Sequence, residues 1–302
     1  MKKIKYKFGF VVLHYKNIED TIECIDSLES QKNIEALIFI VDNFSNDGTK
    51  EQLENKYGEK ENIFLISSKA NLGFAKGNNL GISLARKKGC DFVCLINNDT
   101  LIKQEEFSDK CIEEWEKYNY SIGGPRIIST IDGLDQNPYM LNSHFVKSKK
   151  DAIRMYFVAL VKYIFIKVGF NEWWNKKNIR GSITENLEKV VLDSYKKDFL
   201  LNGACLILSP TFFKKYNKLC DWTFMYEEET IIYFLSRRLG IKNMYFPNIE
   251  IYHKEQSSTK KSFGTEKKKL LFGYKEDLNS RKQLLKIVFR INDIEFLDSL
   301  MK

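Results

Sequence analysis

The sequence predicts an α/β fold with a Rossmann-like, mostly parallel sheet and helices on both of its faces. Over the first hundred residues, short apolar runs rich in β-branched and aromatic residues alternate with longer segments of helical periodicity. Polar residues stand directly after three of the four apolar runs. The 302 residues, of which 43% are hydrophobic and 29% charged, suffice for a large globular domain with its own core.

The alternation predicts the order of the first elements. Strands are expected at residues 8–13, 37–41, 63–66 and 92–96. Helices are expected at residues 18–30, 49–57 and 75–88. Strand–helix–strand units join parallel strands by right-handed crossovers. Ligands of such sheets bind at the carboxyl ends of the strands, so the residues there are the first candidates for a site.

The second half of the chain alternates less regularly. Gly123-Gly124-Pro125 predicts a turn, and Gly240 predicts the end of a helix. The other expected features are a loop at 132–142, an apolar, aromatic and basic stretch at 151–174, a strand-like run at 199–208, a helix at 227–239 and a basic helical tail from 267 onward.

Charge and cysteine content indicate the environment of the protein. The 48 Lys and Arg residues exceed the 40 Asp and Glu residues, and the formal charge of +8 favours nucleotides, nucleic acid or an anionic membrane surface as partners. The six cysteines form no CxxC pair, and several stand inside apolar runs. They predict reduced core thiols in a cytoplasmic protein.

Carboxylates follow two of the predicted strands. Asp99, in Asn97-Asn98-Asp99, could coordinate a hard divalent cation that bridges the two phosphates of a nucleotide. Asp42 could accept the imide N–H of a uracil or thymine base. For both, a cap or turn without any ligand is the alternative.

A glycine-rich segment begins the third expected helix. Gly73, Gly77 and Gly81 stand four residues apart, on one helix face, where the missing side chains allow close approach to the sheet or to a ligand. Asn71 and Lys76, near the start of this helix, are candidates for nucleotide contacts. The sequence contains no GxGxxG or GxxxxGK[ST] pattern, so neither a dinucleotide fingerprint nor a P-loop is predicted.

Two further candidates lie late in the chain. Glu227-Glu228-Glu229 opens an expected helix after an aromatic stretch. Partial burial would raise the pKa of a carboxyl group there and allow general-base work, whereas exposure would leave only a helix start stabilised by the dipole. His253 follows an apolar run and could complete a metal site or bind diphosphate. With three histidines and no Cys/His spacing, zinc is not expected.

Six short segments between residues 8 and 262 occur together in one known family. They are Val41-Asp42-Asn43-x-Ser45-x-Asp47-Gly48-Thr49, Asn71-Leu72-Gly73-Phe74-Ala75-x-Gly77-Asn78-Asn79, Leu95-Ile96-Asn97-Asn98-Asp99, Asn202-Gly203-Ala204, Phe224-Met225-Tyr226-x-Glu228-Glu229 and His253. In order and spacing the chain resembles the family 2 glycosyltransferases of the GT-A fold, especially their bacterial rhamnosyltransferase-like branch.

The resemblance implies a nucleotide site and a metal site. Asp42 looks like the residue that binds the base, and Asn71 like the one that contacts the nucleotide across the cleft. Asn97-Asn98-Asp99 stands in the place of the family's DxD motif, so Asp99 is the implied metal ligand, and His253 would complete the metal or diphosphate site. The whole implied nucleotide-binding set is Asp42, Asn43, Asn71, Gly73, Lys76, Asn97 and Asn98.

The resemblance also implies the chemistry. Glu228-Glu229 stands where the family commonly has Glu-Asp, whose second member is the catalytic base, so Glu229 is the implied base and Glu228 the alternative. Asn202, Gly203 and Ala204 would contact the acceptor or donor sugar. With Mg²⁺ or Mn²⁺ on the diphosphate, a sugar such as rhamnose, galactose or glucose would pass with inversion from a UDP- or dTDP-sugar to a hydroxyl of a glycan or lipid-linked oligosaccharide. The implied pathway is bacterial surface polysaccharide synthesis.

The resemblance further implies a GT-A domain over 1–262 and a basic helical tail over 263–302. Within the domain, the nucleotide-binding half would span about 8–125, a loop and an amphipathic helical insertion 126–197, and the acceptor and catalytic half 198–262.

The stretch 151–174 interleaves aromatic residues with arginine and lysine. Such a mixture suits a membrane interface and predicts peripheral binding on the inner face of the plasma membrane, where a lipid-linked acceptor would lie. Packing on the protein's own core or on a dimer partner is the alternative.

Three other functions stay open. A sugar-phosphate nucleotidyltransferase should have a Gly-rich, Arg-containing loop after the first strand, where this chain has His14-Tyr15-Lys16-Asn17. A basic nucleic-acid-binding protein needs Lys and Arg clustered on one face, whereas charge outside the tail is mixed. An inactive transferase fold is the third, because neither Asn97 nor Asn98 is a carboxylate.

Overall fold

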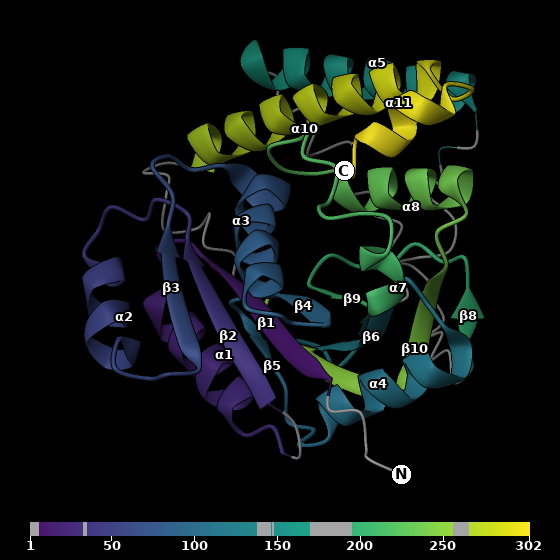
Figure 1. The fold of residues 1–302 in the computed structure, drawn as a ribbon. Coiled ribbons are helices and arrows are strands. Elements are labelled where there is room, and N and C mark those ends of the chain that lie inside the picture. Colours follow the sequence, from purple (N-terminus) through teal and green to yellow (C-terminus); the bar gives the residue numbers. More distant parts are fainter. Residues whose placement is uncertain (1–5, 33–34, 138–145, 147, 170–194, 256–265) are drawn as a thin grey trace.

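One mixed sheet with helices on both faces organises the computed structural model, which describes residues 6–32, 35–137, 146, 148–169, 195–255 and 266–302 (Figure 1). Its strands are β1 (Lys7–His14), β2 (Glu35–Asp42), β3 (Ile63–Ser67), β4 (Phe92–Asn97), β5 (Thr100–Leu101), β6 (Ile122–Ser129), β7 (Asp135–Asn137), β8 (Lys196–Lys197), β9 (Cys205–Leu208) and β10 (Asn243–His253). The described helices are α1 (Ile18–Glu29), α2 (Thr49–Tyr57), α3 (Gly73–Lys87), α4 (Phe107–Tyr118), α5 (Lys149–Lys167), α7 (Pro210–Phe213), α8 (Glu228–Leu239), α10 (Glu266–Phe289) and α11 (Ile294–Ser299).

The first half of the sheet follows the predicted order. The strand order is β3-β2-β1-β4-β9-β6-β10-β5, and β3, β2, β1 and β4 pair in parallel. Every predicted boundary up to β4 lies within two residues of the observed one. His14 pairs with Asp42 and Leu13 with Asn97, so the ends of β2 and β4 flank the end of β1. At ordinary strand spacing, Asp42 and Asn97 are about 10 Å apart.

The turn predicted at Gly123-Gly124-Pro125 is wrong, because these residues lie inside β6. A Cβ on Gly123 would come within 2.9 Å of the rings of both Phe246 and Tyr120, so the glycine serves ring packing on the sheet. The proline lacks a backbone N–H, and beside it the register between β6 and β10 shifts.

Two other boundaries in this half also differ from expectation. The loop expected at 132–142 contains the short strand β7, which pairs antiparallel with β6. The strand-like run expected at 199–208 is a strand only over its last four residues, in β9. The polar sequence of β7 has no apolar alternation from which a strand could be predicted. Backbone pairing with β6 holds the strand in place. The Asn137 side chain adds a hydrogen bond, which it donates to the Pro125 carbonyl at 2.8 Å.

The expected C-terminal helices form a layer with α5. α5 and α10 pack side by side above the ends of α3 and α8 (Figure 1). Leu284, Ile287 and Val288 of α10 are buried in the same apolar cluster as Val11 and Leu95 of the sheet. The described helices include none that is both long and apolar enough to cross a membrane.

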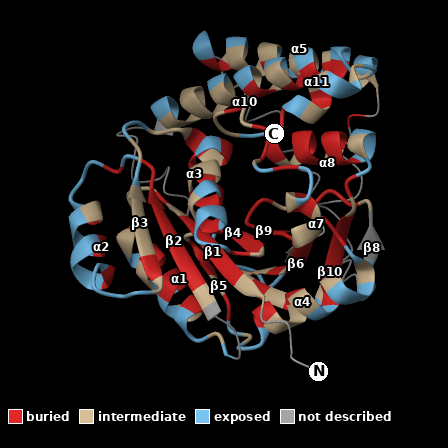
Figure 2. Cartoon of the chain, viewed as in Figure 1, coloured by how far each residue is buried: buried red, intermediate tan, exposed pale blue. Residues whose placement is uncertain are grey.

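Buried residues concentrate in the strands, whereas α5 is mostly half-buried or exposed (Figure 2). All six cysteines are buried and free, as predicted. Burial raises the pKa of the Cys24 thiol to about 12, so this side chain stays uncharged in the core.

Candidate active site

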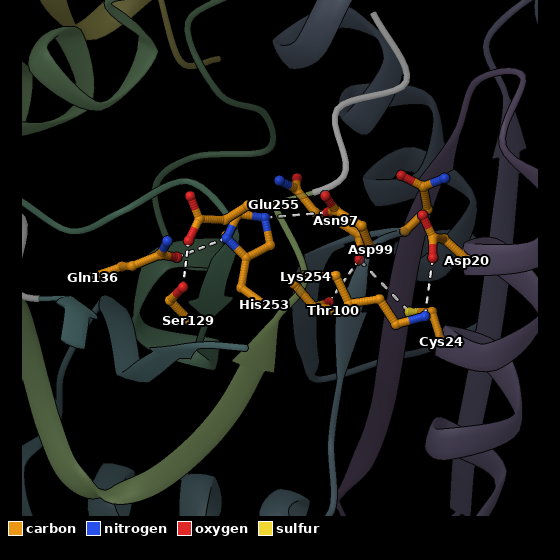
Figure 3. A network of polar contacts seen from close by, with 12 residues as sticks. Asp20, Cys24, Asn97, Asp99, Thr100, Ser129, Gln136, His253, Lys254 and Glu255 are labelled. Atoms are coloured by element: carbon orange, nitrogen blue, oxygen red, sulfur yellow. Dashed lines mark hydrogen bonds and ion pairs between the residues drawn. The ribbon is translucent and has the colours of Figure 1, made fainter. Parts of the chain in front are cut away.

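A carboxylate and a histidine meet where β4, β5 and β10 come together (Figure 3). The distance from Asp99 Oδ1 to His253 Nε2 is 3.2 Å, and both side chains are largely buried. His253 Nδ1 lies 2.7 Å from Gln136 Oε1. With Nδ1 donating to this amide oxygen, Nε2 of the neutral ring turns a lone pair toward the carboxylate. Two acceptors in this arrangement suit a shared proton or a cation.

The same two side chains fit the expected divalent cation. In the described part of the chain, no three His, Cys, Asp or Glu side chains come close enough to form a complete metal cage. Mg²⁺ commonly takes only one or two protein carboxylates and completes its coordination with substrate phosphates and water. Asp99 and His253 could therefore hold a cation together with a diphosphate, and Gln136 would fix the imidazole ring.

Lys254 secures the backbone of this cluster. Its N–H donates to the carbonyl of Asp99 at 2.9 Å, and its ammonium pairs with Asp20 at 2.9 Å and with Glu23, both on α1. Burial alone would lower the pKa of Lys254, but these two carboxylates raise it, so the ammonium stays charged. Its charge is already paired with α1. The contribution of Lys254 to the cluster is therefore the backbone hydrogen bond that holds Asp99 in position.

The predicted nucleotide residues at the ends of β2 and β3 form a second cluster. Asn43 Nδ2 donates to Asn71 Oδ1 and to the Gly73 carbonyl, each at 3.1 Å, and Asn43 Oδ1 accepts from the N–H of Leu72 at 2.8 Å. Asp42 is buried beside it. The contacts of Asn43 thus shape the turn that presents Asn71.

The structure separates the other predicted nucleotide residues. Asn97 lines the cavity described below. Asn98 turns toward α1, where its amide donates to Thr21 Oγ1 at 2.9 Å and to the Asn17 carbonyl at 3.3 Å. Lys76 is exposed on α3.

A cavity of about 440 Å³ brings the predicted sugar and catalytic residues together. Its walls include Asn202, Gly203 and Ala204 together with the start of α8. Glu229 Oε1 accepts from the N–H of Gly203 at 3.2 Å. A Cβ on Gly203 would lie 2.7 Å from that oxygen, so any larger residue would force the Glu229 carboxylate to shift. Asn202 Nδ2 donates to the Gln136 carbonyl at 3.4 Å and so links this wall to the His253 side.

The environments of the two candidate bases differ. Burial, followed by the charge of Glu229, raises the pKa of Glu228 to about 8, although Thr223 donates a hydrogen bond to it. Burial also raises the pKa of Glu229, and the hydrogen bond from Gly203 opposes the increase. Near neutral pH, Glu228 therefore carries a proton and adds no second negative charge beside Glu229.

Residues of α10 complete the cavity, and no sequence signal pointed to them. Asp277 and Arg281 line it, more than forty residues after α8 begins. Arg281 Nε lies 3.1 Å from Glu227 Oε1 and 2.9 Å from Asp277 Oδ1. Tyr226 and Glu227 have φ angles of 71° and 65°, a left-handed conformation that is strained for such side chains. The ion pair and a hydrogen bond from Ser280 to the Met225 carbonyl, 2.6 Å long, stabilise this strained turn.

The chain matches one protein-family model. The model described as glycosyl transferase family 2 matches residues 10–176, more than half of the chain. The chain belongs to this family. A comparison with curated proteins found no match. The rhamnosyltransferase-like branch stays a prediction.

Two solved structures share the fold. Staphylococcus aureus TarS 1–349 is 16% identical, with a TM-score of 0.50 over 82% of this chain and 60% of the TarS chain. GalNAc-T7, solved with UDP, GalNAc and Mn²⁺, is 11% identical, with a TM-score of 0.57 over 85% of this chain and 45% of its own. The chain thus spans less than two thirds of either protein. These likenesses confirm the predicted GT-A-like α/β fold.

Proposed function

We propose that the chain is an inverting, metal-dependent glycosyltransferase that moves a sugar from a UDP- or dTDP-sugar to a hydroxyl of a glycan or lipid-linked oligosaccharide. The observation that carries this proposal is a continuous series of contacts. It runs from Asp99 through His253, Gln136 and the Asn202 turn to Glu229. The proposed diphosphate site and the Glu229 carboxylate thus belong to one frame of contacts.

Each end of this frame has a separate chemical task. A cation held by Asp99 and His253 would neutralise negative charge on the leaving diphosphate. Glu229 would take the proton of the acceptor hydroxyl, while the Gly203 N–H keeps its carboxylate in place. The acceptor oxygen would attack the anomeric carbon on the side away from the leaving group, which inverts that carbon. The proton on Glu228 limits repulsion beside the base.

The donor assignment rests on the cluster at the end of β2. Buried Asp42 would accept the imide N–H of a pyrimidine base, and Asn71 would contact the nucleotide from the opposite turn. TarS 1–349 was also solved with UDP, with a TM-score of 0.50 and 14% identity over 94% of this chain and 71% of that one. A uracil or thymine diphosphate is therefore the donor class we propose, and bacterial surface polysaccharide synthesis the pathway.

Nucleotide binding provides the direct test. UDP or dTDP with Mn²⁺ should raise the thermal unfolding midpoint by several degrees at about 100 times Kd, and EDTA should abolish the increase. GDP and CDP should produce smaller shifts. Asp42→Asn should reduce the shift in unfolding midpoint. The control is Asp47→Asn, because the Asp47 carboxylate accepts from the N–H of Thr49 at the start of α2; this variant should show the full shift. No shift with any nucleotide would favour an inactive fold or a nucleic-acid-binding protein.

A membrane-facing role is proposed for α5. Apolar side chains recur at helical spacing on or just after this helix, and they are 44% to 62% exposed: Phe157, Val161, Ile164 and Val168. The buried side chains of α5 occupy other positions, and the helix packs on α10. Arg154, Lys162 and Lys167 add positive charge to the same helix. This combination suits an anionic lipid surface. Trp173 and Trp174, within the stretch 151–174, lie outside the described residues.

Vesicle flotation should detect this contact. The protein should float with vesicles of phosphatidylglycerol and not with phosphatidylcholine alone, and salt should weaken the binding. Phe157→Glu combined with Ile164→Glu should abolish flotation. The control combines Gln52→Glu with Asn55→Glu, at exposed positions of α2. It adds the same charge, and this variant should still float. If both double variants float like the unmodified protein, α5 is not the lipid contact, and dimerisation through α5 becomes the hypothesis to test.

A further inference from the structure

We propose that a groove on α10 is an acceptor subsite, which binds the second sugar residue of a neutral glycan whose terminal residue occupies the transfer cavity. The proposal deepens the proposed function and rests on it. The sequence comparisons and the family resemblance assign no role to α10.

The groove adjoins the transfer cavity and shares two wall residues with it. It has a volume of about 290 Å³, and Tyr226 and Asp277 line both spaces. Its remaining walls come from one stretch of α10: Lys269, Leu270, Phe272, Gly273 and Tyr274. A chain of sugars that presents its terminal hydroxyl to Glu229 would therefore leave the cavity past Tyr226 and enter this groove.

A glycine and a strained tyrosine lie beside each other in the wall of the groove. Gly273 lies in the interior of α10, where glycine destabilises a helix. A Cβ there would make an ordinary contact of 3.4 Å with Tyr226 Oη, so a side chain larger than alanine would extend into the space beside the tyrosine. Tyr226 is 41% exposed although its backbone is left-handed. Strain of this kind persists where surrounding structure imposes it, as Ser280 and Arg281 do here.

The chemistry of the groove suits a sugar ring. Its walls offer the aromatic rings of Tyr226, Tyr274 and Phe272, and the last of these is held edge-on by Phe224 at a centroid distance of 6.3 Å. Aromatic faces pack against the C–H faces of sugars, and a carboxylate such as Asp277 accepts hydrogen bonds from their hydroxyls.

Charge argues for a neutral occupant at the entrance. Arg281 is paired with both Glu227 and Asp277, so its charge is already balanced by two carboxylates. A phosphate or a lipid diphosphate passing between the cavity and the groove would meet these carboxylates. Lys269 in the groove wall brings the summed charge of these side chains to zero, and an uncharged sugar residue would find hydrogen-bond partners among them.

The test compares saccharides of different length. Saturation-transfer NMR in the presence of UDP and Mn²⁺ measures the affinity for methyl glycosides of lactose, maltose, cellobiose and diacetylchitobiose. Each disaccharide is compared with the methyl glycoside of its terminal monosaccharide. We expect at least one disaccharide to bind about tenfold more tightly than its monosaccharide. Gly273→Leu should fill the groove and remove this advantage, and Tyr274→Ala should reduce it. Lys275→Leu places the same side chain on an exposed position of α10, and this variant should retain the tighter binding of the disaccharide.

The outcomes separate this proposal from the proposed function. If UDP still shifts the unfolding midpoint but length has no effect, or if Gly273→Leu and Lys275→Leu behave alike, the subsite is refuted and the donor site stands. Failure of every saccharide to bind also refutes it. Tighter binding of dodecyl phosphate than of any disaccharide, with loss in Gly273→Leu, would assign the groove to lipid and overturn the glycan. Loss of the nucleotide shift in the unmodified protein would refute the proposed function itself.

Discussion

Glu229→Gln is expected to lower kcat by about 100- to 10,000-fold, the usual contribution of a general base. The amide retains the size of the side chain but cannot take the acceptor proton. Its oxygen can still accept from the Gly203 N–H, so the fold and nucleotide binding should persist. Release of UDP or dTDP with a competent acceptor measures turnover, and the nucleotide-dependent thermal shift reports folding.

Glu228→Gln is the matched control for this prediction. Glu228 is protonated near neutral pH, because burial and the charge of Glu229 raise its pKa to about 8. Glutamine imitates that neutral form, so most of the activity should remain. If Glu228→Gln is the more damaging of the two changes, the base has been assigned to the wrong residue.

Stability should depend on pH at the same residue. A carboxyl group with a raised pKa in the folded state favours folding most below its unfolded pKa, and this contribution is lost as pH rises to the folded pKa. For Glu228 that range extends from about 4.5 to about 8. Glu228→Gln should therefore gain stability relative to the unmodified protein between about pH 5 and about pH 9. A constant difference in unfolding midpoint across this range would contradict the burial of an ionisable Glu228.

Asp99→Asn is expected to lower activity by at least about 100-fold and to weaken the Mn²⁺ dependence of nucleotide binding. An amide oxygen is a weaker ligand for a hard cation than a carboxylate, and it leaves the diphosphate charge less well compensated. His253→Ala should show a similar defect, because it removes the neighbouring donor 3.2 Å away. Titration of Mn²⁺ against the UDP-induced thermal shift measures the apparent metal affinity.

Two variants define the specificity of this effect. Gln136→Leu leaves both proposed ligands in place but removes the hydrogen bond that orients His253, and it should weaken metal affinity about 10- to 100-fold. Glu250, three residues before the histidine on β10, pairs with Arg126 and contacts neither proposed ligand, so Glu250→Gln should have little effect. Unchanged Mn²⁺ dependence in Asp99→Asn would refute the proposed metal site.

Much of the first hundred residues could be predicted because the elements there carry local patterns. The alternation of apolar strands with periodic helices located every boundary up to β4 within two residues. β6 could not be predicted in this way. Gly123 and Pro125 normally indicate a turn, and only the rings of Phe246 and Tyr120, packed against the glycine, explain its place in a strand.

The sequence by itself determined the order of the βα units and the polar residues at the strand ends, among them Asp42 and Asp99, because strand and helix periodicity is a property of neighbouring residues. Only the tertiary structure decided that burial raises the pKa of Glu228 to about 8, that Gln136 orients His253, and that α10 lines the cavity through Arg281. Burial and these contacts join residues tens to hundreds of positions apart, so packing establishes them and no local pattern records them.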